Sequence, residues 1–128
     1  MTEPRYRLRY RFDHGAGCCL WGDDTATTER FGYAVEPENL PLSPATVARI
    51  AEVIAWHETS LNWAYPPDPG PWRRAECERF NAVARALHIE IVRELGVIFV
   101  VRDEQPPLQE APDLDAYLDD PPHFRRSL

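Results

Sequence analysis

The side chains with the widest chemical repertoire in this sequence are three cysteines and four histidines. A thiol becomes a strong nucleophile when a histidine lies beside it, and folding brings such partners together from distant parts of a chain. Cys18 and Cys19 are adjacent, whereas Cys77 lies far along the chain. Because no recognisable motif surrounds any of them, we predict no catalytic residue and keep a small thiol enzyme as an alternative.

Metal binding is the second chemistry that these residues could support. The cysteine pair at 18–19 follows His14 closely, but adjacent residues of a strand point to opposite faces and rarely share one ion. His57 opens the metalloprotease pattern, yet Leu61 occupies the position where that pattern needs its second histidine. We therefore expect no metal site and no cofactor.

The charge balance narrows the classes of partner. The chain has 21 Asp and Glu against 14 Lys and Arg, a formal net charge of −7. Proteins that neutralise phosphates need a basic face, so we predict no nucleic acid and favour a basic protein partner. An odd number of cysteines is typical of reduced thiols. No apolar run approaches the ~20 residues of a membrane helix, and no signal peptide is recognisable, so we expect a cytoplasmic protein without membrane contact.

The most suggestive candidate for a binding site is the segment NWAYPPDPGPW, Asn62–Trp72. Its prolines stiffen the chain and lower the entropy lost on ordering it, and aromatic side chains are common anchors of protein interfaces. We assign partner binding to Trp63, Tyr65, Asp68 and Trp72. The alternative is a rigid lid whose aromatic side chains cap the core between two helices.

Acidic residues on predicted loops and strand ends extend this candidate surface. They would attract a basic partner, and opposite charge speeds encounter more than it deepens affinity. We assign Asp23 and Asp24 to partner binding, and Glu36 and Glu38 share their predicted setting. Each of these carboxylates could equally be an ordinary solvated charge.

Three short strands are predicted to position these residues. RYRLRYRF, Arg5–Phe12, alternates arginine with apolar residues, so four arginines should share one face of a strand. This pattern also fits an edge strand that is protected from aggregation by its charges. Cys18–Gly22 is expected to return as the second strand of a hairpin, and Arg30–Glu36 alternates again as a third strand.

Two helices and a last strand follow. Ser43 is a typical N-cap for a helix over residues 43–62, and a second helix is predicted over 71–95 and ended by Gly96. One face of the second helix is apolar at helical spacing: Cys77, Phe80, Ala84, Leu87, Ile91 and Leu95. Val97–Val101 is apolar throughout, which predicts an internal strand. The order βββααβ predicts a two-layer α+β fold, with a small, mostly antiparallel sheet packed on a pair of helices.

The C-terminal part differs in composition. Residues 1–102 are expected to form a single domain, and residues 103–128 form a tail with five prolines and seven acidic residues. Such a composition is common in disordered segments, but Leu108, Leu114 and Tyr117 favour docking. We expect the tail to fold over the sheet and to pair with its arginine row, and a loose tail is the alternative.

Three stretches carry a family resemblance: CLWG at 19–22, FGYAVEPENLPLS at 31–43 and the helix run from Trp72 to Val101. They resemble the immunity proteins that bacteria encode beside polymorphic toxins. Most of these positions are core and turn residues, which mark a fold more than a function. The resemblance implies a small acidic α+β protein that binds its cognate toxin and blocks it without chemistry of its own, and it transfers no individual toxin-binding residue.

The sequence as a whole therefore predicts a non-catalytic, protein-binding protein. Its most specific form is an immunity-type inhibitor that neutralises a toxin by covering it. A small thiol enzyme and a structural or regulatory subunit are the alternatives. The sequence makes no prediction about oligomeric state.

Overall fold

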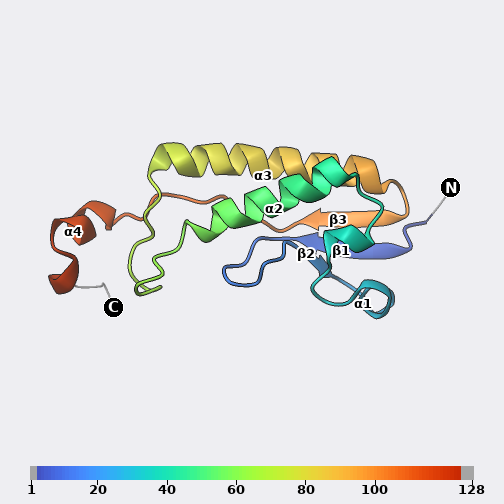
Figure 1. Ribbon diagram of the computed structural model, residues 1–128, viewed down its shortest axis with the longest axis horizontal. Coiled ribbons are helices and arrows are strands. Elements are labelled where there is room, and N and C mark those ends of the chain that lie inside the picture. Colours follow the sequence, from blue (N-terminus) through green and yellow to red (C-terminus); the bar gives the residue numbers. More distant parts are fainter. Residues whose placement is uncertain (1–2, 125–128) are drawn as a thin grey trace.

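A three-stranded sheet lies under two long helices in the computed structural model, which describes residues 3–124 (Figure 1). β1 (Tyr6–Tyr10) is the central strand, paired antiparallel with β2 (Leu20–Gly22) and parallel with β3 (Phe99–Asp103). The fold is α+β, as predicted, but its sheet is mixed rather than mostly antiparallel. The arginine-bearing strand is central and not at an edge, because both of its neighbours pair with it.

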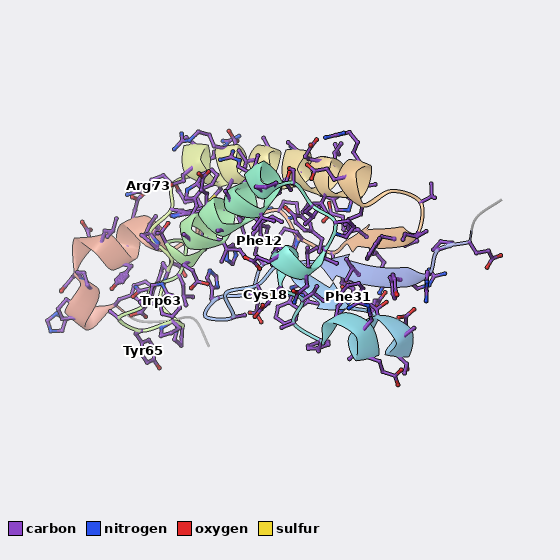
Figure 2. The ribbon with its side chains drawn as sticks, turned by 45° about the vertical axis from the view of Figure 1, so that its right-hand side comes forward. Phe12, Cys18, Phe31, Trp63, Tyr65 and Arg73 are labelled. Carbon is purple, nitrogen blue, oxygen red and sulfur yellow. The ribbon has the colours of Figure 1, made fainter. Side chains whose placement is uncertain are left out.

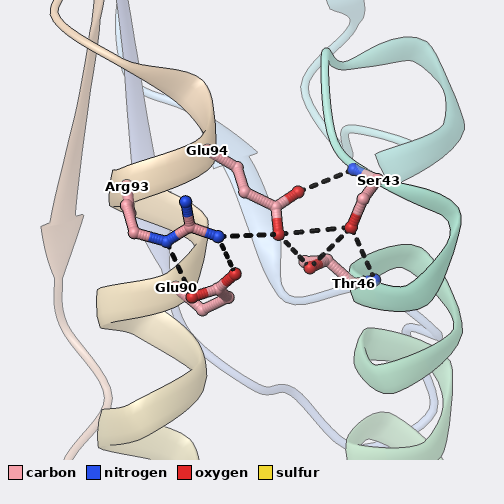
Figure 3. A network of polar contacts seen from close by, with 5 residues as sticks. All are labelled: Ser43, Thr46, Glu90, Arg93 and Glu94. Carbon is pink, nitrogen blue, oxygen red and sulfur yellow. Dashed lines mark hydrogen bonds and ion pairs between the residues drawn. The ribbon is translucent and has the colours of Figure 1, made fainter.

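The two long helices begin and end where the sequence signals lie. α2 (Pro44–Glu58) starts after Ser43, whose hydroxyl accepts the backbone N–H of Thr46. The carboxylate of Glu94, near the end of α3 (Arg74–Leu95), accepts the backbone N–H of Ser43 and the hydroxyls of Ser43 and Thr46 (Figure 3). Gly96 ends α3 with a positive φ of 75°, which a residue without a Cβ adopts readily.

The predicted apolar face of α3 is confirmed, since all six of its residues are buried. They pack with α2 and with the helix-facing side of the sheet, where Leu8, Tyr10, Phe99 and Val101 lie. The Tyr10 hydroxyl donates a 2.7 Å hydrogen bond to the carbonyl of Ala84, so the largest ring in the centre of the core keeps its polar atom satisfied. The core is thus the layer between α2–α3 and one face of the sheet.

The predicted third strand over 30–36 is wrong. α1 (Thr25–Phe31) takes up its first two residues, and in the remainder an isolated bridge between Trp21 and Ala34 keeps part of the pairing with β2. Asp24 caps the helix by accepting the backbone N–H of Thr27, and the Thr27 hydroxyl in turn accepts the N–H of Arg7 on β1. A cap and a tertiary hydrogen bond therefore stabilise a helix at residues 25–31, where the sequence predicted only the start of a strand at residue 30.

The last strand begins two residues later than predicted, and it is an edge strand. Val97 and Ile98 are exposed in the turn after α3, and β3 follows from Phe99. The order along the chain is β1, β2, α1, α2, α3, β3 and α4 (Leu114–Asp119), with short 3₁₀ helices at Pro37–Asn39 and Pro121–His123. This order replaces the predicted βββααβ.

The acidic tail lies against the beginning of α3, away from most of the sheet (Figure 1). The Asn81 side chain both accepts the N–H of Leu108, at 2.8 Å, and donates to its carbonyl, at 3.0 Å. Arg73 pairs with Glu110 and Asp115. Glu104, at the start of the tail, does pair with Arg9 of the arginine row at 3.5 Å. The following part of the described tail lies away from that row, because Arg73 and Asn81 offer it polar partners. Residues 125–128 of the expected tail lie outside the described residues.

Candidate functional site

The connection between α2 and α3 is held in one shape by its own polar groups. The Asn62 side chain accepts the N–H groups of Ala64 and Tyr65, each at 3.1 Å, and donates to the carbonyl of Pro69. Gly70 approaches α2's end so closely that a Cβ there would lie 2.2 Å from the carbonyl oxygen of Ser60. The loop is therefore pre-organised, which lowers the entropy that binding would cost.

Trp63 and Tyr65 are exposed on this loop, by 55% and 48% of their surfaces. Figure 2 shows both side chains at one end of the molecule, away from Phe31. The Trp63 indole N–H donates to the carbonyl of Glu58 at 2.6 Å, so the ring is fixed although much of it is open to solvent. Asp68 lies in the same loop, and its N–H donates to the carbonyl of Tyr65. Rigid, half-open aromatic rings of this kind are suited to a protein interface.

Trp72 does not share this setting, and its assignment to partner binding is wrong. Only 6% of its surface is exposed. Its ring packs against Trp56 and Phe80, and its indole N–H donates to the Thr59 hydroxyl. The lid interpretation therefore holds for Trp72, at the α3 end of the loop, while Trp63 and Tyr65 lie outside the core.

A pair of stacked histidines, His14 and His57, lies beside the start of the loop. The rings of His14 and His57 lie 4.2 Å apart, and the Nε2 atom of His14 is 2.7 Å from the Ser60 hydroxyl. His57 is buried, and this burial, together with the neighbouring His14, lowers its pKa from 6.5 to about 4, although Asp13 acts in the opposite direction. The His57 side chain is therefore neutral near pH 7.

The hairpin between β1 and β2 joins the same end of the molecule. The carboxylate of Glu58 accepts the N–H of Gly15 with both oxygens at 3.0 Å. The edge of His14 faces the Trp63 ring, with centroids 6.3 Å apart. The sequence does not predict that His14, Glu58 and Ser60 support the loop. The one sign of it is that a histidine and a glutamate, His57 and Glu58, stand together near the end of the predicted first helix without completing a metal-binding pattern.

Asp23 and Asp24 lie elsewhere, on the arginine face of the sheet. Asp23 pairs with Arg9 at 3.8 Å and with Arg102 at 3.0 Å. Asp24 caps α1 and lies 4.0 Å from Arg7, and its hydrogen bonds with Thr27 lower the pKa of its carboxyl group. The two carboxylates, together with Glu104 at 3.5 Å from Arg9, thus pair with the arginine row within the chain. The predicted surface therefore divides into two separate regions.

A family model described as Serratia CdiI immunity protein-like matches residues 6–102 of this chain. The match covers β1, β2, α1, α2, α3 and all of β3 except its last residue, and it includes the loop Asn62–Trp72, called the aromatic loop from here on. The chain belongs to the Serratia CdiI immunity protein-like family. This membership points to a toxin-neutralising binding protein, as the resemblance of the sequence implied. No curated protein matches the chain.

The three thiols of this CdiI immunity-like chain are buried and unpaired by disulfides. Burial raises the pKa of Cys18, Cys19 and Cys77, the last also through nearby carboxylates of which Glu110 contributes most. A raised pKa keeps a thiol protonated and unreactive near neutral pH. The geometry therefore gives the thiol-enzyme alternative no support.

Two further features of the CdiI immunity-like chain concern metals and membranes. Within residues 3–124, no group of three or more His, Cys, Asp or Glu side chains is arranged to hold a metal ion. In the same part of the chain, no helix is both long enough and apolar enough to cross a membrane.

Proposed function

We propose that this chain is a non-catalytic inhibitor that binds a cognate bacterial toxin in the cytoplasm and covers its active surface. The family match over residues 6–102 is the observation that carries this proposal. The rigid aromatic loop supports it further, because pre-organised aromatic side chains lose little entropy on binding.

The aromatic loop supplies the contact surface in this proposal. Trp63 and Tyr65 are the anchors, and Asp68 provides the loop's carboxylate toward a basic toxin surface. The net charge of −7 favours encounter with such a partner. Occlusion would need no chemistry from the inhibitor, since a toxin whose substrate-binding face is covered cannot turn over.

The test takes the product of the gene immediately upstream as the candidate toxin and uses its toxin domain in a catalytically inactive form. Trp63→Ala and Tyr65→Ala are each expected to weaken its binding by at least about 2 kcal/mol, the usual size for an interface anchor, and Asp68→Lys is expected to slow association. Titration calorimetry measures the affinities, and stopped-flow fluorescence measures the association rates. Protection of cells that produce the active toxin gives the biological readout.

Tyr33→Ala is the matched control, because Tyr33 is a similarly exposed tyrosine on the other region, where its hydroxyl accepts from Arg9. This variant should bind the toxin like the unmodified protein. Unchanged binding in both aromatic-loop variants would remove the loop from the interface. Absence of binding and protection by the unmodified protein would refute the inhibitor function itself.

A further inference from the structure

A groove of about 560 Å³ lies between α2 and the segment at 34–38 that follows α1. One wall is the apolar side of α2, and the other wall is the 34–38 segment itself. The residues that line it on α2 are all aliphatic: Val47, Ile50, Ala51, Ile54 and Ala55. A concavity of this size accommodates one or two large side chains of a partner.

The charged residues that line this groove are Glu36 and Glu38. Both side chains are exposed, and within residues 3–124 neither forms an ion pair or a side-chain hydrogen bond. The carboxylates of the arginine face differ, since Asp23 and Asp24 already have arginine partners. An apolar groove whose only charges are two unpaired carboxylates is complementary to an apolar group flanked by cations.

The groove continues toward the aromatic loop through the β1–β2 hairpin. Ala16, Gly17 and Cys18 of this hairpin also line the groove. In the same hairpin, Gly15 is bound by Glu58 and His14 faces Trp63. Figure 2 shows Cys18 between Trp63 and Phe31. One partner could therefore contact the exposed aromatic rings and the groove together.

We propose that the groove receives a segment of the cognate toxin in which an apolar side chain is flanked by lysine or arginine. This inference rests on the proposed inhibitor function and deepens it, because it places half of the interface along α2. The apolar side chain fills the space between Ile54 and Val35, and the flanking cations meet Glu36 and Glu38. An anionic metabolite would be repelled by the same carboxylates.

The first experiment fills the groove. Ala51 is exposed on its helical wall, so Ala51→Trp blocks the space without replacing a core residue. Ala82→Trp on α3 is the matched control, because Ala82 is also an exposed helical alanine and does not line the groove. With the inactive toxin domain as the probe, Ala51→Trp should raise Kd at least tenfold, whereas Ala82→Trp should leave Kd within twofold and both should melt normally.

The second experiment reverses the charge of the rim. The double variant Glu36→Lys, Glu38→Lys is expected to raise Kd about tenfold, chiefly through slower association, with an effect that shrinks at high salt. The double variant Glu29→Lys, Asp119→Lys changes net charge equally on exposed residues of α1 and α4. A smaller effect of this control separates a local contact from the general attraction of an acidic protein.

The outcomes distinguish this inference from the function on which it rests. If the unmodified protein binds the toxin and both groove variants bind within twofold of it, the groove is not part of the interface, and the inhibitor function stands. If the unmodified protein does not bind, both proposals fail.

Discussion

The two ends of the α2–α3 pair are closed by different physical means. At the end where α2 begins, polar side chains satisfy the helix: Glu94 accepts from Ser43 and Thr46, and Arg93 pairs with Glu90 (Figure 3). At the end where α2 stops, a histidine stack and a stiff loop cover the core and leave two aromatic rings open. The polar side chains of the first end stabilise the fold, whereas the second end presents two aromatic side chains that lie outside the core.

This difference predicts which substitutions act on stability and which act on binding. Changes at the capped end, defined by Ser43, Thr46, Glu90, Arg93 and Glu94, should lower the free energy of unfolding and leave toxin affinity intact. Changes to exposed rings at the loop end should do the reverse. Changes to the loop's internal supports should affect both, because they move the rings.

The largest effect is expected at Gly70. Gly70→Ala places a methyl group 2.2 Å from the Ser60 carbonyl oxygen, so the loop must move away from the end of α2. Overpacking of this kind typically costs 1–3 kcal/mol, and we expect about 3 kcal/mol here because the obstructing atom belongs to the backbone. Chemical denaturation measures the loss, and the toxin affinity should fall with it as Trp63 and Tyr65 shift.

Gly96→Ala is the control at the opposite end. Gly96 ends α3 with a φ of 75°, but nothing lies within 4 Å of a Cβ built there. Its substitution should therefore cost only the backbone preference, about 1 kcal/mol, and leave toxin affinity unchanged. Equal costs at the two glycines would mean that the loop does not pack rigidly against α2.

The two ends of the α2–α3 pair should lose stability at different pH values. The pKa of His57 is about 4 in the folded protein and near 6.5 when unfolded, so the unfolded state takes up the proton first. The stability that neutral His57 contributes to the folded state is complete above pH 6.5. It is lost as the pH falls toward 4, which lowers the free energy of unfolding by about 2–3 kcal/mol. Urea unfolding from pH 7 to 4.5 tests this, with His57→Phe as the variant that should lose this part of the slope.

Two neighbouring groups, His14 and Asp13, also affect the pKa of His57. His14 opposes a positive charge on His57, and Asp13 favours one. His14→Phe should therefore raise the pKa of His57 only in part, because burial is the larger cause. An unchanged pH slope in His57→Phe would show that other groups carry the acid sensitivity of this end.

The capped end should respond at lower pH and by a smaller amount. Hydrogen bonds from Ser43 and Thr46 lower the pKa of Glu94 to about 2, so its contribution is present above about pH 4.5 and is lost as the pH falls toward 2. Glu94→Gln should cost about 1–2 kcal/mol at pH 7, since a neutral amide is a weaker acceptor and presents N–H groups to other donors. Thermal unfolding at pH 7 and pH 3 measures both effects.

Toxin affinity provides the control for Glu94→Gln. The substitution lies at the far end of α2 from the aromatic loop, so Kd should stay within twofold of that of the unmodified protein. A clear loss of affinity would instead extend the interface to the capped end. A loss of stability that is equal at both pH values would mean that the charge of Glu94 is not what the cap requires.

The sequence predicted those elements whose signals are local and repeated. The six buried residues of α3 recur at helical spacing, and Ser43 and Gly96 are strong boundary residues, so both long helices were predicted within a few residues. α1 was missed because it is short and its threonines are poor helix formers, and because the hydrogen bond from Arg7 that fixes Thr27 comes from a distant part of the chain. The parallel pairing of β1 with β3 likewise depends on where the helices return the chain.

The candidate site was predicted as a segment, but not residue by residue. A proline-rich loop has no periodicity, so Trp63 and Trp72 could not be distinguished, although one lies outside the core and the other inside it. Asp23 and Asp24 had the composition of free acidic residues, and only the pleat of β1 places Arg7 and Arg9 beside them. The residue types predicted that aromatic rings and carboxylates are present. Tertiary contacts determine which of them are taken up by the core or by ion pairs within the chain.

The smallest expected effect is at Arg93, and it tests whether the capped end depends on the Glu94 hydrogen bonds or on the charges around them. Arg93 pairs with Glu90 within one turn of α3 and reaches Glu94 at 3.9 Å, and its side chain is largely exposed. Exposed pairs of this kind stabilise a protein only weakly, so Arg93→Ala should lower the free energy of unfolding by less than Glu94→Gln does. Raising the salt concentration should remove even this difference in thermal unfolding. A cost equal to that of Glu94→Gln would mean that Arg93 holds the Glu94 carboxylate in place, and that the capped end is a charge network rather than a helix cap.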